Sequence, residues 1–368
     1  MVHMAKIELA NMQIKRVEKE LRDTPHHKGT DHHIGRLRAR LAKLKDGLSG
    51  DSSKGGGGGV GYSVKKQGDA TVVLIGPPSV GKSTLINKLT NAQSKVAPYA
   101  FTTVSVIPGM LVYNNARIQI LDVPGLIKGA EEGKGRGREV LSVVRGCDLL
   151  AFITDINDLG AYERITETLY QNGVRINQNP PNVIIDKKIG GGLLVHSNIK
   201  QDLARETIKD IAIEMGVKNA DITLNEKINT DRLIDAFSLN RVYIPAIYIL
   251  NKIDLSNGNE KIENHRTKYG TVDISAESDF GINDLKRAMW SALEFVNIYL
   301  VEPGQKPTFD SPTIMKYGDR LVEVAEGIGT EFATRVKSAK IWGPGSKFPG
   351  QEVSLSTKVV EGMQIQFI

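Results

Sequence analysis

The sequence contains one cysteine, only 6% aromatic residues and no long hydrophobic run among its 368 residues. Cys147 has no second cysteine with which to form a disulfide inside the chain, which favours a reducing compartment. The longest apolar stretch, near residues 242–250, is far shorter than the roughly 20 residues of a membrane-spanning helix. The N-terminal region carries frequent charges and no apolar secretory core. We therefore expect a cytoplasmic protein that has no membrane partner.

Charge is distributed unevenly along the chain. Residues 1–66 contain 14 Lys and Arg against 7 Asp and Glu, so the net charge of this segment alone exceeds the net charge of the whole chain, +6. The remaining residues are close to neutral. Such asymmetry indicates a nucleic acid or another polyanion as a partner. The alternative interpretation is a well-solvated pair of helices.

Two apolar series with heptad-like spacing open the chain: Ile7, Ala10, Ile14, Val17 and Leu21, then Ile34, Leu37, Leu41, Leu44 and Leu48. Each series places its apolar residues on one side of a helix. Thr24-Pro25 ends the first helix, which predicts an antiparallel helical hairpin over residues 1–48. Five consecutive glycines, 55–59, then predict a flexible linker over residues 49–68.

From residue 70 onward, buried strand patterns alternate with helical patterns, which predicts an α/β fold with a mostly parallel sheet. Asp155 and Asn251 end two of the strand patterns. They are separated by about 60 more residues than a β-α-β crossover needs. The sequence therefore predicts a small inserted α+β domain over residues 172–238. The main domain then comprises residues 69–171 and 239–296. A helix over 322–335 is predicted inside a separate C-terminal domain, 297–368.

The strand pattern at 71–75 leads into a glycine-containing loop and then a helix. The loop reads Gly76-Pro77-Pro78-Ser79-Val80-Gly81-Lys82-Ser83-Thr84. It fits G-x-x-x-x-G-K-[ST] in the strand–loop–helix context that a phosphate-binding P-loop requires. We expect the backbone N–H groups to surround phosphates at the helix N-terminus. Lys82 is predicted to contact the β- and γ-phosphates, and the Ser83 hydroxyl to bind Mg²⁺.

Two further segments follow the P-loop in the order typical of nucleotide-dependent switch proteins: Phe101-Thr102-Thr103 and Asp122-Val123-Pro124-Gly125. Asp122 is predicted to be an indirect magnesium partner. Gly125 can offer its N–H to the γ-phosphate, because it has no side chain to obstruct that approach. Thr103 is the predicted switch threonine that closes over Mg²⁺, and Thr102 is the alternative. The predicted catalytic residues are Lys82, Thr103 and Gly125.

The choice of base is predicted from Asn251-Lys252-Ile253-Asp254, which follows a strand pattern. The Asp254 carboxylate can accept hydrogen bonds from N1–H and the exocyclic amine of guanine. Adenine offers neither donor and would leave a buried acceptor unpaired, at a cost of about 1–3 kcal/mol or more. Backbone contacts from Ser275-Ala276-Glu277 are predicted to complete the pocket. The predicted nucleotide is therefore GTP, with GDP as its product.

These residues also carry a family resemblance. The P-loop, the segment 99–103 and the segment 122–130 are similar to those of the Obg-like GTPases of the TRAFAC class. The glycine- and arginine-rich segment 132–138 and Arg241-Val-Tyr-Ile-Pro245 resemble the developmentally regulated GTP-binding (DRG) branch. The resemblance implies a small α+β domain inserted in the GTPase core and a C-terminal ubiquitin-like β-grasp (TGS) domain. It further implies GTP hydrolysis, action on ribosomes or structured RNA, and a regulatory protein partner.

Leu126 occupies the position where many small GTPases have a glutamine that orients the attacking water. A leucine cannot do so, which predicts slow intrinsic hydrolysis. Relatives that use potassium have an asparagine where this chain has Ser79, so stimulation by K⁺ stays open. Two functions remain in view: a GTP-hydrolysing switch that acts on ribosomes or structured RNA, and a nucleotide-gated scaffold for a protein partner. An ATPase is disfavoured because Asp254 should reject adenine.

Overall fold

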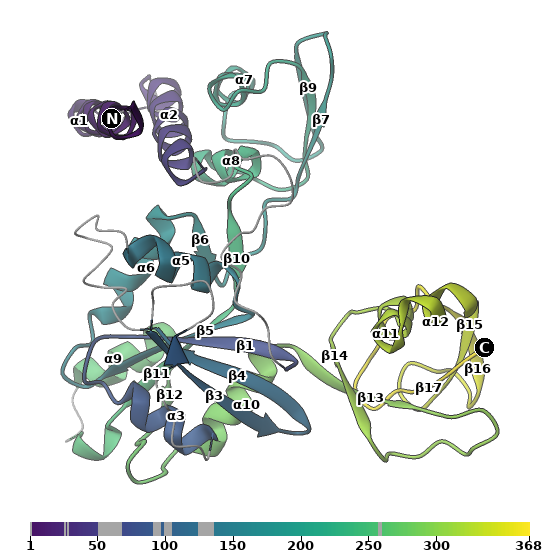
Figure 1. The fold of residues 1–368 in the computed structure, drawn as a ribbon. Coiled ribbons are helices and arrows are strands. Elements are labelled where there is room, and N and C mark those ends of the chain that lie inside the picture. The colour runs from purple at the N-terminus through teal and green to yellow at the C-terminus, as the bar shows by residue number, and fades with distance from the viewer. Residues whose placement is uncertain are drawn as a thin grey trace. The chain divides into compact units, whose positions relative to one another are not determined.

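The computed structural model describes residues 2–25, 27, 29–50, 68–90, 97–98, 105–123, 136–256 and 260–368. The chain divides into two compact units. Unit 1 joins Met1–Gly61 to Gly173–Tyr243, and unit 2 joins Tyr62–Asn172 to Ile244–Ile368. Figure 1 shows the helices and strands of both. Within the described part of the chain, no helix is both long and apolar enough to cross a membrane.

The main sheet of unit 2 has seven strands in the order β12-β11-β5-β1-β4-β3-β2. Their bounds are β1 Ala70–Ile75, β2 Ala97–Pro98, β3 Ser105–Tyr113, β4 Ala116–Asp122, β5 Leu149–Asp155, β11 Ala246–Asn251 and β12 Val272–Asp273. The five strands from β12 to β4 are parallel, whereas β3 runs antiparallel to β4. The carboxyl ends of the parallel strands therefore meet at one edge, where α/β sheets bind ligands. This confirms the α/β fold with its mostly parallel sheet.

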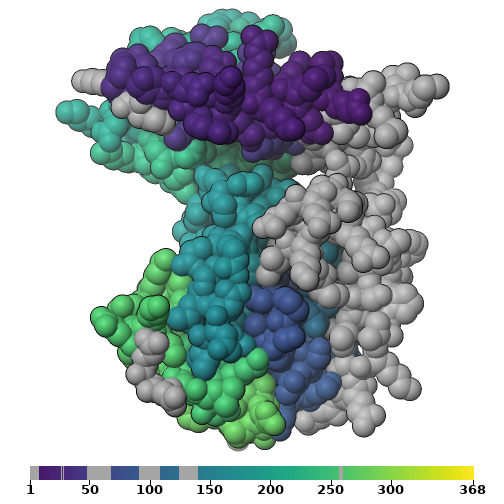
Figure 2. All heavy atoms as spheres, turned by 90° about the vertical axis from the view of Figure 1, so that its left-hand side faces the viewer, coloured from purple at the N-terminus to yellow at the C-terminus, as the bar shows by residue number. Residues whose placement is uncertain are grey.

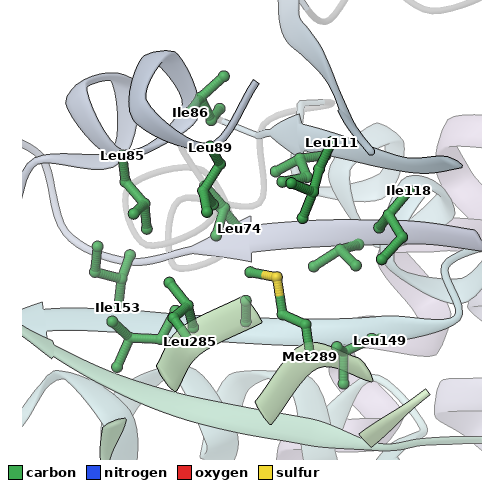
Figure 3. Packing of buried hydrophobic residues seen from close by; sticks show 14 of the residues in the cluster. Leu74, Leu85, Ile86, Leu89, Leu111, Ile118, Leu149, Ile153, Leu285 and Met289 are labelled. Carbon is green, nitrogen blue, oxygen red and sulfur yellow. The ribbon is translucent and has the colours of Figure 1, made fainter. Parts of the chain in front are cut away.

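Helices α3 (Lys82–Thr90) and α10 (Ile282–Ala292) cover one face of this sheet. Figure 3 shows their aliphatic side chains meeting those of the strands, with Met289 of α10 among them. On the other face lie α5 (Arg136–Arg145), α6 (Ala161–Gln171) and α9 (Glu260–Tyr269), where Tyr162 packs against Phe152 and His265. Burial of both faces explains why the parallel strands are almost continuously apolar.

Unit 1 contains the hairpin, α1 (Val2–Asp23) and α2 (Asp31–Gly50), together with the inserted segment. The insertion has a sheet in the order β7-β9-β8 with two helices and a two-stranded β6–β10 ladder. Their bounds are β6 Val174–Ile176, β7 Val183–Lys187, β8 Leu193–Ser197, α7 Arg205–Glu214, β9 Ala220–Leu224, α8 Thr230–Phe237 and β10 Val242–Ile244. Ala39 of α2 belongs to the same hydrophobic core as Ile211 of α7 and Leu233 of α8.

Helix α2 has two packing faces, and the heptad pattern revealed only the one directed at α1. Its second face lies against α7: a Cβ built on Gly35 would be 3.4 Å from Ile211 Cδ1. Polar contacts fix the same face, since Lys43 Nζ donates to the carbonyl oxygen of Glu214 at 2.7 Å and Arg38 pairs with Asp231 at 3.3 Å. The hairpin and the insertion therefore fold as one unit despite their separation in sequence.

The C-terminal region of unit 2 is a five-stranded mixed sheet in the order β14-β13-β17-β15-β16. Its elements are β13 Phe295–Leu300, β14 Pro312–Lys316, α11 Leu321–Ile328, α12 Thr330–Arg335, β15 Ser338–Trp342, β16 Gln351–Ser354 and β17 Gln364–Phe367. Leu321 and Val324 of α11 pack on this sheet, as in a ubiquitin-like β-grasp. The single helix predicted over 322–335 is wrong, because Gly329 takes an extended conformation and separates α11 from α12.

Candidate functional site

The loop of residues 76–81 connects β1 to α3 at the carboxyl edge of the sheet. Gly76 passes so close to β5 that a Cβ there would lie 2.1 Å from the carbonyl oxygen of Ile153. Gly81 has a φ of +93°, and a Cβ on it would lie 2.4 Å from Asn251 Nδ2. Ser79 also has positive φ, +64°. The tight course of this loop therefore explains why glycine occupies positions 76 and 81.

Lys82 is the first residue of α3, and its side chain turns back over the loop. Its Nζ donates to the carbonyl oxygens of Pro77 at 2.6 Å and Gly76 at 3.1 Å. Burial lowers the pKa of the Lys82 ammonium, while the Asp122 carboxylate opposes that shift. The cation is therefore held where the loop surrounds it, the position that a phosphate-binding lysine needs.

Asp122 ends β4 and is buried, 5% exposed. Ser83 Oγ donates to its Oδ2 at 3.5 Å, whereas its Oδ1 is buried with no hydrogen-bond partner among the described residues. Burial raises the pKa of Asp122 above its usual value of 3.8, against the opposing effects of Lys82 and the Ser83 hydrogen bond. A buried acceptor without a partner is costly unless a cation or water satisfies it. The hydroxyl and the carboxylate are the oxygen ligands that Mg²⁺ prefers, so these residues fit that ion.

Asn251 joins the base-recognition segment to the P-loop. Its buried side chain donates from Nδ2 to the carbonyl oxygen of Val80 at 2.7 Å and accepts from Ala276 N–H at 3.0 Å through Oδ1. One amide group thus connects the P-loop, the end of β11 and the segment after β12. These three parts of the predicted site come together in the fold.

The neighbouring Lys252 makes a second connection to the P-loop. Its backbone is left-handed, with φ +60°, and its Nζ donates to the carbonyl oxygen of Ser79 at 2.8 Å. The same Nζ contacts Asp155 Oδ2 at 2.7 Å. Asp155 ends β5, between β11 and β1, and was not among the predicted site residues. The sequence feature that could have identified Asp155 is its position as an acidic residue at the carboxyl end of a buried strand.

The remaining predicted residues of this region differ in exposure. Asp254 lies in the short 3-10 helix η1 (Ile253–Leu255), where it is exposed to solvent. Ser275 is buried and its Oγ accepts from Ser278 N–H at 3.3 Å, whereas Glu277 is exposed. In the P-loop motif, Pro78 and Thr84 are exposed and Val80 is buried, and Val123, which follows Asp122, is also buried. The exposed Asp254 carboxylate is therefore accessible to a ligand.

Several predicted residues lie outside the described residues: Phe101, Thr102, Thr103, Pro124 and Gly125. The same holds for Leu126. The described part of the site therefore comprises the P-loop, Asp122, Val123 and the base-recognition residues.

Comparison with known protein families divides the chain into three regions. Residues 71–187 match the family described as 50S ribosome-binding GTPase, and residues 190–295 match the C-terminal region of that domain. Residues 296–368 match the TGS domain. The TGS match coincides with the β-grasp region built from β13 to β17.

Curated relatives are similar over nearly the whole chain. An uncharacterized GTP-binding protein of Methanocaldococcus jannaschii is 44% identical, over 95% of this chain and 90% of the relative. Developmentally-regulated GTP-binding protein 1 of Xenopus laevis is 40% identical, over 93% and 94%. Ribosome-interacting GTPase 1 of Saccharomyces cerevisiae is 38% identical, over 94% and 95%. With its P-loop domain and C-terminal TGS domain, the chain belongs to the developmentally regulated GTP-binding protein family of GTPases.

Proposed function

We propose that this GTP-binding protein hydrolyses GTP to GDP and phosphate as a magnesium-dependent molecular switch, and that it acts on ribosomes or structured RNA. The observation that carries the proposal is the pair of connections made by Asn251, which holds the P-loop and the segment of Ala276 against one strand end. Family membership supports GTP hydrolysis in general. The geometry of the P-loop, Asp122 and the base-recognition residues supports the roles proposed for them below, whereas the roles of Thr103 and Gly125 rest on the sequence motifs.

The phosphates would lie over the P-loop, where its backbone N–H groups and Lys82 neutralise their charge. Ser83 and, indirectly, Asp122 would hold Mg²⁺, together with Thr103. The ion would supply positive charge that offsets the negative charge developing between the β- and γ-phosphates. The buried, unpartnered Oδ1 of Asp122 supports this assignment.

Guanine would be recognised by Asp254, with backbone contacts from Ser275, Ala276 and Glu277 closing the pocket. The side chain of Lys252 is held between Ser79 and Asp155, so the loop that carries Asp254 is fixed relative to the P-loop. A fixed acceptor discriminates better than a mobile one, because an incorrect base cannot move it into an alternative pairing.

Thr103 and Gly125 would respond to the γ-phosphate and couple its loss to a conformational change. We propose that intrinsic hydrolysis is slow, since Leu126 offers no group that can orient the attacking water. A macromolecular partner or K⁺ would then supply the missing interaction.

The proposed partner is the ribosome or structured RNA in the cytoplasm. The family description of residues 71–187 and the name of the yeast relative support the ribosome. The excess positive charge of residues 1–66 supports RNA as the partner, because phosphate groups attract cationic side chains whatever the base sequence of the RNA. The second candidate is a nucleotide-gated scaffold for a regulatory protein, which the leucine at position 126 favours.

The decisive experiment is GTP turnover in potassium and in sodium buffer, each with and without purified ribosomes. We expect slow basal turnover and stimulation by ribosomes. Lys82→Ala should reduce GTP binding or turnover at least tenfold, whereas Lys88→Ala, a matched loss of a lysine on the same helix, should change neither. Stimulation by potassium alone would make hydrolysis independent of ribosomes, and negligible turnover in every condition would overturn the hydrolytic switch and favour the scaffold.

Sucrose-gradient sedimentation tests the partner separately. The protein should move with ribosomes in the presence of a non-hydrolysable GTP analogue and less so with GDP. Failure to sediment with ribosomes in either state would overturn the ribosomal role, although GTP hydrolysis could still be measured in solution.

A further inference from the structure

The hairpin carries two kinds of cationic side chain, which the structure separates. Arg38 and Lys43 of α2 contact the inserted segment, and Lys45 pairs with Glu18 of α1 at 2.9 Å. These three residues hold unit 1 together. A second set is exposed and has no ion-pair or hydrogen-bond partner among the described residues: Lys15, Arg16, Lys19 and Arg22 on α1, and Arg36 and Arg40 on α2.

The exposed set forms a row on each helix. Lys15, Lys19 and Arg22 follow i, i+4, i+7 spacing and therefore lie on one face of α1. Val17, which is buried, lies on the opposite face of that helix. Arg36 and Arg40 are likewise four residues apart, on the part of α2 that contacts neither α1 nor the insertion. Figure 2 shows the two helices as a band across the outer surface of unit 1.

Acidic side chains do not neutralise the row on α1. Glu18 and Glu20, in the middle of the helix, are directed to α2, where they contact Lys45 and His33. Of the other two acidic residues of α1, Glu8 precedes the row, whereas Asp23 follows Lys19 by four residues and lies beside it at the end of the helix. The three cations of the row therefore outnumber the one acidic residue beside them that has no partner on α2.

The residue types on this surface indicate which polyanion fits. Residues 1–50 contain no Phe, Trp or Tyr, so the hairpin has none of the aromatic platforms on which unpaired bases stack. Arg36 and Arg40 lie on a helix that is fixed by Gly35, Arg38 and Lys43. Rows of cations on fixed helices match a regular phosphate backbone rather than a flexible single strand.

We propose that the exposed cations of α1 and α2 bind the phosphate backbone of double-stranded RNA, independently of base sequence. This inference rests on the proposed action on structured RNA and names the surface and the form of RNA. It assigns Lys15, Lys19, Arg22, Arg36 and Arg40 to RNA contact, and it assigns Arg38, Lys43 and Lys45 to packing.

The test measures binding of the full chain to an RNA duplex of about 20 base pairs as a function of salt concentration. Each lost phosphate contact should reduce the slope of log affinity against log salt by about one. Arg36→Gln with Arg40→Gln should therefore lower the slope by about two, and Lys15→Gln with Lys19→Gln and Arg22→Gln by about three. Lys286→Gln with Arg287→Gln, on α10, removes two charges from unit 2 and should leave the slope unchanged.

Circular dichroism and GTP turnover of the same variants should match those of the unaltered protein, which separates lost contacts from misfolding. Tighter binding to a single strand of the same length, or unchanged slopes in both hairpin variants, would overturn the inference. If the slopes are unchanged while ribosomes still stimulate turnover, only the hairpin assignment fails. If the slopes fall as expected but ribosomes neither bind nor stimulate, the duplex site stands and the ribosomal role fails.

Discussion

Arg241 Nη1 donates to Asp46 Oδ1 at 2.8 Å, joining residues that lie 195 positions apart in the chain. Arg241 Nε also contacts Asp235 Oδ1 at 2.7 Å, and the same buried carboxylate accepts two hydrogen bonds from Arg175. The network thus connects α2 of the hairpin, α8 of the insertion, strand β6 and the residue that precedes β10. Arg241 belongs to the Arg-Val-Tyr-Ile-Pro segment that supported the family resemblance, and its role here is to join the two parts of unit 1.

Replacement of Asp235 by alanine should therefore destabilise unit 1. The guanidinium groups of Arg175 and Arg241 would remain buried without their shared carboxylate, which costs about 3–5 kcal/mol in comparable sites. Denaturant unfolding and amide hydrogen exchange of α2 and α8 would measure the loss. Asp231→Ala removes the partially exposed partner of Arg38 and should cost less than about 1 kcal/mol. Equal effects of the two substitutions would contradict this ranking.

Asn251→Ala should weaken GTP binding at least tenfold, because it removes the hydrogen bonds to Val80 and Ala276 and leaves their buried backbone groups unpaired. The expected loss of stability is about 1–3 kcal/mol. Fluorescent-nucleotide titration and thermal unfolding would report the two quantities. Asn229→Ala, which removes the side-chain cap of α8 in unit 1, should cost about 1 kcal/mol of stability and leave GTP affinity unchanged. An unaltered GTP affinity in Asn251→Ala would remove Asn251 from the site.

Asp254→Asn should change base preference more than overall folding. The amide would place a donor where the carboxylate accepts from the exocyclic amine of guanine, whereas xanthine has a carbonyl oxygen at that position. We expect GTP affinity to fall at least tenfold and xanthosine triphosphate affinity to rise. Competition binding with the two nucleotides measures the exchange. Loss of both affinities together would indicate a structural role for Asp254 instead.

Asp122→Asn should stabilise the nucleotide-free protein at neutral pH while reducing the dependence of GTP affinity on magnesium. Because folding raises the pKa of this carboxyl, its contribution to stability is present at low pH and is lost as pH rises through the folded-state value. The variant should therefore exceed the unaltered protein by about 1 kcal/mol at pH 7.

That difference in unfolding free energy should shrink as the pH is lowered, since the raised pKa lets Asp122 take up a proton in the folded protein at a higher pH than in the unfolded chain. Denaturant titrations of both proteins at several pH values would measure this difference. The contributions of all other titrating groups cancel, because both proteins contain them. A variant that is less stable than the unaltered protein at pH 7 would show that the charged Asp122 carboxylate does not destabilise the folded state.

The sequence alone determined those features whose physical cause is local. The P-loop from Gly76 to Thr84 and the segment from Asn251 to Asp254 are contiguous, and their flanking strands and helices follow from hydrophobic periodicity. The parallel order of the main sheet could also be predicted, because alternating strands and helices have few other ways to bury both faces of a sheet. The helix predicted over 322–335 failed because sequence periodicity continues across Gly329 although the backbone does not.

Tertiary structure alone decided which distant segments share a core. Helix α2 packs on α7 through small residues, Gly35 and Ala39, which leave little signal in a pattern of large apolar side chains. Asp155 became part of the site only because β5 lies between β11 and β1. The division of the hairpin cations into packing residues and exposed residues likewise depends on long-range contacts. Such contacts are set by complementarity between surfaces, and no single segment of sequence contains both of those surfaces.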